Sequence, residues 1–129
     1  MSYDIYLRCP CCKVSPELPN PTYNLTGVFD LALTGEALPN PDVSEGQVVI
    51  FKAPTDRPRG LRILSGRRAE ETITVLEEAL ARIQSPALEE AFSALLPANG
   101  WGTLPGAILV LEILLEESRE HLGNVWEIA

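Results

Sequence analysis

Histidine is scarce in this sequence, because His121 is the only one among its 129 residues. Hydrolases of the triad type need a base beside their nucleophile, and histidine usually supplies it. Phosphate-binding loops are missing too: the stretch from Gly60 to Gly66 lacks the Lys-Ser/Thr ending, and Gly100 and Gly102 lack a third glycine. We therefore predict a protein that is not an enzyme and that uses no cofactor.

Basic residues are also few. The chain has 10 lysines and arginines against 18 aspartates and glutamates, which gives a net charge of −8. Nucleic-acid binding depends on cations that release counterions from phosphates, so we expect no direct binding to nucleic acid. An acidic surface can instead meet a basic surface on another protein, although acidity also serves solubility alone. Many acids lie in the second half of the chain: Glu70, Glu71, Glu77, Glu78, Glu89, Glu90, Glu112, Glu116, Glu117 and Glu120.

Long apolar runs are absent from the sequence. The longest extends from Leu104 to Leu115, far short of the roughly 20 residues that span a bilayer, and Glu112 interrupts it. The first residues show no positively charged start followed by an apolar stretch, so we expect no signal peptide. These features predict a cytoplasmic protein without membrane association.

Cysteine occurs only in the motif Cys9-Pro10-Cys11-Cys12. Three thiols so close together cannot form an ordinary disulfide framework, which favours a reducing compartment. A zinc site usually has four ligands, and the only further soft ligand is His121, so metal binding would need shared ligands or oligomerisation. Redox pairs usually have two residues between the thiols and a helix that begins after them, and we expect neither feature at this motif. We interpret the cysteines as turn residues, with metal binding and redox chemistry as alternatives.

Hydrophobic periodicity and capping residues predict the order of the elements. Tyr3, Ile5 and Leu7 alternate with polar residues in a strand at 2–8, and Trp126 and Ile128 do so in a strand at 124–129. We expect loops at 15–21 and 36–46, a strand at 47–52 and a strand or turn at 60–64. We expect a helix capped by Thr22 or Thr26 that ends before Gly35, a second from Arg67 or Ala69 to Ile83, and a third from Pro86 to Pro97. The last helix is expected from Leu104 to Leu122, with Thr103 as its cap and Gly123 following.

The last of these helices has the most continuous apolar stripe. The residues expected to face the core are Leu104, Ile108, Leu111, Leu115 and Leu122, with Ala107, Leu114 and Ser118 at the margin. Glu116, Glu117 and Glu120 lie near its C-terminus, where the helix dipole disfavours negative charge. This placement indicates a surface selected for something other than helix stability.

Together these elements predict one α+β domain over residues 1–129. Both chain termini are expected in one small antiparallel sheet, with three to four helices packed on one face. The hydrophobic content of 46% is sufficient for a single core.

Two expected loops carry aromatic side chains beside polar amides. Tyr23 and Asn24 lie in one loop, and Asn99 and Trp101 lie in the other. Such side chains often anchor partners. The alternatives are structural: Asn24 caps or turns the backbone, Asn99 belongs to a turn, and Trp101 fills the core between the last two helices. The candidate partner-binding residues are Tyr23, Asn24, Asn99, Trp101, Glu116, Glu117 and Glu120; we assign no catalytic residue and no metal ligand.

Three stretches carry a resemblance to a known family: 2–7 (Ser-Tyr-Asp-Ile-Tyr-Leu), 20–26 (Asn-Pro-Thr-Tyr-Asn-Leu-Thr) and 99–102 (Asn-Gly-Trp-Gly) before an apolar helix. In this order the chain resembles small phage and prophage-type bacterial proteins of unknown function. The segments at 60–62, 65–66 and 69–80 are similar in order and spacing. The cysteine motif departs from the family, which has an Asp-Pro-containing hairpin at this place. The resemblance implies a phage-associated accessory protein without known cofactor or reaction.

The leading hypothesis is a non-enzymatic protein-binding module, phage-associated, that inhibits a host protein such as a defence component through its acidic surface. The alternative is a metal-binding or small-molecule-binding protein that uses Cys9, Cys11 and Cys12. A third hypothesis, an enzyme of unfamiliar kind, has the least support because neither a histidine base nor a cofactor motif is present.

Overall fold

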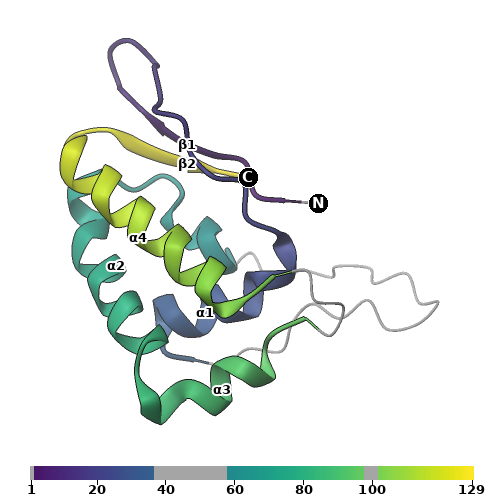
Figure 1. Ribbon diagram of the computed structural model, residues 1–129. Coiled ribbons are helices and arrows are strands. Elements are labelled where there is room, and N and C mark those ends of the chain that lie inside the picture. The colour runs from purple at the N-terminus through teal and green to yellow at the C-terminus, as the bar shows by residue number, and fades with distance from the viewer. Residues whose placement is uncertain (1, 37–57, 98–101) are drawn as a thin grey trace.

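The computed structural model describes residues 2–36, 58–97 and 102–129, and a thin grey trace marks the others in Figure 1. The strand expected at 47–52, nearly all of the loop expected at 36–46, and the candidate residues Asn99 and Trp101 lie outside the described residues.

The two ends of the chain form an antiparallel pair of strands, β1 (Ile5–Arg8) and β2 (Val125–Ile128). Ile5 lies opposite Ile128, and Leu7 lies opposite Trp126. These four side chains are buried on one face of the sheet because side chains alternate along a strand. The prediction that both termini share one small antiparallel sheet is confirmed.

Both outer edges of this sheet are covered by irregular chain. Along β1, the Tyr3 amide donates to the Pro21 carbonyl and the Leu7 amide donates to Ser15 Oγ, each at 2.8 Å. Along β2, Gly66 N–H donates to the Trp126 carbonyl at 2.7 Å. The prolines of segment 15–21 cannot donate to a ladder, so this segment remains the loop that the sequence predicts and still shields the edge.

Four α-helices lie on one side of the sheet, and α3 is the one farthest from the strands (Figure 1). The longest two, α2 and α4, pack against each other, and α1 packs against α2. Three 3₁₀ helices complete the described elements. The helical elements are η1 (Tyr23–Leu25), α1 (Thr26–Thr34), η2 (Gly60–Leu64), α2 (Ala69–Ile83), η3 (Pro86–Leu88), α3 (Glu89–Ala94) and α4 (Leu104–Glu120). The predicted α+β class is therefore confirmed.

Local sequence signals explain where these helices begin and end. Thr103 Oγ1 accepts a hydrogen bond from the Gly106 amide at 3.2 Å and caps α4, as expected. Gly35 follows α1 with a φ of 78°, which glycine adopts without the steric cost of a side chain. None of the helices in the described ranges has the length and apolar character that a bilayer crossing requires.

Two expectations about the elements are wrong. The stretch 60–64 is a 3₁₀ helix and not a strand or simple turn, and it buries Leu61 and Leu64, which are three residues apart and share a face. The last helix ends at Glu120, because His121 has a φ of −125° and leaves the helix. Leu122 therefore lies outside the core stripe and is 61% exposed.

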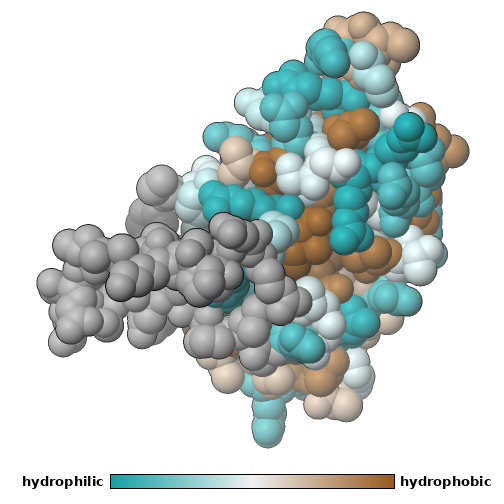
Figure 2. All heavy atoms as spheres, turned by 180° about the vertical axis from the view of Figure 1, so that it is seen from behind, coloured by the Kyte–Doolittle hydropathy of each residue, from teal (hydrophilic) through white to brown (hydrophobic). Residues whose placement is uncertain are grey.

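The buried apolar side chains of the described residues form one core in which sheet and helices meet. A few polar groups are buried within it. Trp126 of β2 donates its indole N–H to Thr72 Oγ1 of α2 at 3.0 Å, and Ser118 Oγ of α4 lies 3.2 Å from the same oxygen. Both hydroxyls also donate hydrogen bonds to backbone carbonyls of their own helices, so each buried hydroxyl has hydrogen-bond partners. On the face seen in Figure 2, apolar residues reach the surface only between polar ones.

Candidate functional site

The exposed side of α4 carries a row of acids. Glu112, Glu116 and Glu120 are four residues apart, so they lie along one side of the helix, and all three are exposed. No lysine, arginine or histidine among the described residues forms an ion pair with any of them. We call these three residues the acidic stripe.

The exposed acids of α2 have partners within the fold, whereas Glu89 and Glu90 of α3, like the acidic stripe, form no ion pair with another described residue. Glu77 forms an ion pair with Arg119 at 3.1 Å, and Glu78 lies 3.8 Å from Arg82. Glu70 accepts from the Gly123 amide at 3.3 Å, and Glu71 accepts from the Arg68 amide at 3.2 Å, which caps the start of α2. In the described part of the chain the acidic stripe thus differs from the acids of α2 by its lack of partners, and from Glu89 and Glu90 by its regular spacing along one side of a long helix.

Glu117 differs from its two predicted companions. Its side chain is only 22% exposed, and its Oε2 lies 3.1 Å from Nε2 of His121, one turn further along. The carboxylates of Glu117 and Glu120 and the His121 imidazole lie within 4.8 Å of one another. In the described ranges this is the only group of three or more such side chains close enough to share an ion, and the three cysteines do not form one. The structure therefore places Glu116 and Glu120 on the stripe and turns Glu117 towards His121.

An apolar side chain lies next to the acidic stripe. Leu109 is three residues before Glu112 on the same helix and is 57% exposed. Residues three apart on a helix are neighbours, so Leu109 extends the stripe with an apolar contact. A surface of this kind offers both charge and a small hydrophobic anchor.

Tyr23 has a set of contacts inside the molecule. Its hydroxyl donates to the Ala129 carbonyl at 3.0 Å and accepts from Arg62 Nη2 at 3.1 Å. Its ring meets Tyr3 edge to face, with 4.6 Å between the centroids. Asn24 beside it is exposed, and its backbone N–H donates to Thr22 Oγ1 at 3.2 Å. Tyr23 thus ties the end of the chain to η1, while the Asn24 side chain faces solvent.

The structure does not bring Tyr23 and Asn24 close to the acidic stripe. The start of α4 lies at η1, because a Cβ added to Gly102 would lie only 2.9 Å from Leu25 Cγ. Glu116 follows Leu104 by twelve residues, and a helical rise of 1.5 Å per residue separates them by about 18 Å along the helix. The candidate residues therefore belong to two separate surfaces.

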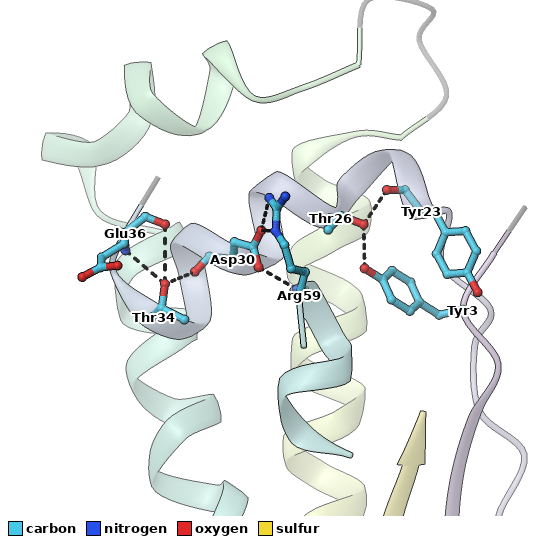
Figure 3. A network of polar contacts seen from close by, with 8 residues as sticks. Tyr3, Tyr23, Thr26, Asp30, Thr34, Glu36 and Arg59 are labelled. Atoms are coloured by element: carbon cyan, nitrogen blue, oxygen red, sulfur yellow. Dashed lines mark hydrogen bonds and ion pairs between the residues drawn. The ribbon is translucent and has the colours of Figure 1, made fainter. Parts of the chain in front are cut away.

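A buried polar network around α1 was missed by the sequence reasoning (Figure 3). Asp30 is 1% exposed and accepts from Arg59 Nε at 2.8 Å and from the Gly60 amide at 2.6 Å. An acid in an otherwise apolar helix is the signal that could have found it, because a buried carboxylate needs donors. Asp30 fixes the chain at 59–60 onto α1, so its role is structural.

Tyr3 belongs to the same region. Its hydroxyl lies 2.6 Å from Thr26 Oγ1, which itself donates to the Tyr23 carbonyl at 2.6 Å. Since a threonine hydroxyl has one proton, Tyr3 is the donor in its contact with Thr26. Burial raises the pKa of Tyr3 above its ordinary value, because the phenolate would lose its hydration.

The cysteines occupy the turn after β1, as the sequence predicts. Cys11 and Cys12 are exposed, Cys9 is partly buried, and all three are free thiols. Cys9 also borders an open cleft of about 690 Å³ between this turn, Ser65 and Trp126. The expectation that the motif lacks the spacing of a redox pair is wrong, because Cys9 and Cys12 have two residues between them.

No family model matches this chain, and neither a curated protein nor a solved structure is detectably similar to it.

Proposed function

We propose that this protein is a non-enzymatic binding module that uses the acidic stripe of α4 to dock onto a basic surface of another protein. The single observation that carries this proposal is that Glu112, Glu116 and Glu120 are exposed, aligned and without cationic partners in the described residues. The partner's lysines and arginines would supply the missing countercharge.

The stripe is unfavourable for the isolated helix. Like charges four residues apart repel by about 0.2–0.5 kcal/mol per pair. Glu120 is the last residue of α4, where exposed carbonyls already carry negative partial charge. The arrangement therefore lowers the stability of the free protein slightly, and a basic partner would relieve the repulsion.

The chemistry of the stripe favours a protein partner. Acidic side chains repel phosphate backbones, and Leu109 offers a hydrophobic contact beside the charges. The resemblance to phage-type proteins supports a host protein as the target, with inhibition of a defence component as the proposed outcome and the cytoplasm as the place. Metal or small-molecule binding by Cys9, Cys11 and Cys12 stays a prediction, to be checked by elemental analysis.

The test is affinity purification from a lysate of the natural host with three forms of the tagged protein. The first is the wild type, and the second carries Glu112→Gln, Glu116→Gln and Glu120→Gln. The third is a matched control with the same change in net charge, Glu17→Gln, Glu89→Gln and Glu90→Gln, on exposed acids away from α4. Mass spectrometry then compares the proteins retained.

We expect a partner with a basic surface that the wild type and the control retain and that the stripe variant loses. Circular dichroism of all three forms checks that each is folded. Equal retention by the wild type and the stripe variant, or equal loss in the stripe variant and the control, would contradict a stripe-specific interaction.

A further inference from the structure

The turn that holds the cysteines is fixed by hydrogen bonds at its base and at its end. The Cys9 amide donates to the Val14 carbonyl, and the Lys13 amide donates back to the Cys9 carbonyl, both at 2.9 Å. Lys13 has a φ of 61°, which reverses the chain direction. The loop projects from the sheet beyond the helices (Figure 1), so its thiols are accessible to other molecules.

Within this turn Cys9 differs from the other two cysteines. The backbone N–H and thiol of Cys12, followed by the backbone N–H of Cys11, lower the pKa of Cys9 through hydrogen bonds to its sulfur. The cause is this set of hydrogen bonds and not a neighbouring charge. Cys9 is therefore the thiol most readily converted to the nucleophilic thiolate.

The surroundings of Cys9 also leave room for a reaction partner. Of the three cysteines, Cys9 is the one that lines the cleft of about 690 Å³. Pro10, Lys13, Gly66 and Val125 also line this cleft. The cleft has room for a small disulfide beside Cys9, and the Cys12 thiol is within hydrogen-bonding reach of the Cys9 sulfur.

We propose that Cys9 and Cys12 form a redox-active thiol pair that exchanges with small-molecule disulfides, Cys9 as the attacking thiol and Cys12 as the resolving thiol. The Cys9 thiolate attacks one sulfur of the substrate disulfide, the substrate S–S bond breaks, and the departing sulfur leaves as a thiolate with the electron pair. Cys12 then loses its proton to solvent and attacks Cys9 Sγ. The second substrate thiolate departs, and an intramolecular Cys9–Cys12 disulfide remains.

The step balances because two cysteines give up two electrons and the substrate disulfide becomes two thiols. Cys11 takes no part in it, which makes Cys11 the internal control. This inference stands apart from the acidic stripe, which lies on α4, so either proposal can fail alone.

The test treats the reduced full-length protein with oxidised glutathione and maps the products by peptide mass spectrometry. We expect a Cys9–Cys12 disulfide in the wild type and in Cys11→Ser. In Cys12→Ser we expect glutathione trapped on Cys9, and in Cys9→Ser the loss of both products. A disulfide between Cys11 and Cys12, or glutathione distributed equally over the three thiols, would overturn the proposal.

A second measurement follows the rate of iodoacetamide alkylation of each cysteine against pH, in the native protein and in urea. The profile of Cys9 should shift to lower pH in the native protein relative to Cys11, and the shift should vanish in urea because the turn is lost. Superimposed profiles for Cys9 and Cys11 in the native protein would overturn the assignment of Cys9 as the attacking thiol. Circular dichroism confirms that the serine variants keep the fold.

Discussion

At the scale of single residues, Asp30 is the acid on which the fold depends most. Its carboxylate accepts from the Arg59 guanidinium and from the Gly60 amide, and it has almost no contact with solvent. Asp30→Ala would leave a half-buried guanidinium and a buried amide without an acceptor. We expect a loss of about 3 kcal/mol in the free energy of unfolding, measured by urea denaturation.

Two further variants make this prediction specific. Asp30→Asn keeps an oxygen for the Gly60 amide but loses the charge. Its free energy of unfolding should therefore lie between those of the wild type and Asp30→Ala. Glu89→Ala, at an exposed acid, should change stability by less than about 0.5 kcal/mol. An Asp30→Ala protein as stable as Glu89→Ala would show that the network contributes nothing.

Among the described glycines, Gly60 has the least room for a side chain. Its φ is 58°, and a Cβ at this position would collide with the Tyr3 hydroxyl. Gly60→Ala therefore combines backbone strain with overpacking, and we expect a loss of about 2–4 kcal/mol in the free energy of unfolding. Gly66→Ala is the matched control, because Gly66 has a φ of 84° and open space around it. Gly66→Ala should lower the free energy of unfolding only through backbone strain, by about 1–2 kcal/mol. Equal losses in the two variants would contradict the expected collision between a Cβ at position 60 and the Tyr3 hydroxyl.

Tyr3 should make stability depend on pH in the alkaline range. Because its folded-state pKa is raised above the value of about 10 found in unfolded chains, the unfolded state loses this proton first as pH rises. The contribution of the protonated Tyr3 hydroxyl to the free energy of unfolding is therefore complete below pH 10 and declines above it. Tyr3→Phe should lower the free energy of unfolding by about 1 kcal/mol at pH 8 through the lost hydrogen bond to Thr26.

The check is urea denaturation from pH 8 to pH 11. The difference between the wild type and Tyr3→Phe should shrink above pH 10, because only the wild type must keep a buried phenol protonated. A difference that stays constant over this range would contradict the link between burial and the pKa of Tyr3.

At the scale of elements, one arginine of α2 donates hydrogen bonds to the end of α1. Arg82 of α2 donates through Nη1 to the Ala32 carbonyl at 2.9 Å and, more weakly, to the Leu33 carbonyl at 3.4 Å. These carbonyls lie in the last turn of α1, where they lack partners within the helix. The guanidinium thus caps α1 from a neighbouring helix and interacts favourably with its dipole.

Arg82→Met should lower the free energy of unfolding by about 1.5–3 kcal/mol, since a charged hydrogen bond is lost while much of the packing is kept. Arg119→Met provides the comparison, because Arg119 forms only an exposed ion pair with Glu77. It should change stability by about 0.5 kcal/mol or less. Equal effects in thermal or urea unfolding would show that Arg82 is no more than a surface residue.

The elements also show which parts of the fold are predictable from sequence. The strands at both termini, α2 and the start of α4 follow from local periodicity and caps, and these predictions are confirmed. The 3₁₀ helix at 60–64 and the exposure of Leu122 were not predicted, because short apolar runs do not reveal their period and a helix end depends on tertiary contacts.

The candidate site was predictable only in part. Glu116 and Glu120 were identified from their place near the end of a helix, and their spacing to Glu112 is visible in the sequence. The pairing of Glu117 with His121 and the tethering of Tyr23 to Ala129 depend on side-chain positions. The second joins residues 106 positions apart, and no local pattern encodes such a contact.

At the scale of the whole molecule, the net charge of −8 is unevenly compensated. Among the described residues, four arginines form ion pairs, and their partners are Asp30, Glu77, Glu78 and Glu127. The acidic stripe receives none of them, although it lies on the helix that packs along α2. The molecule thus presents a negative face with one apolar residue, Leu109, at its margin, which is the surface we propose for docking.

The most direct test of this account is the dissociation constant of the recovered partner, purified and titrated with the three forms of the protein at low and at high salt. We expect the wild type and the Glu17, Glu89, Glu90 control to bind alike, and the stripe variant to bind at least about tenfold more weakly at low salt. The difference should narrow at high salt as the charges are screened. Equal affinities of the wild type and the stripe variant at low salt would contradict the account.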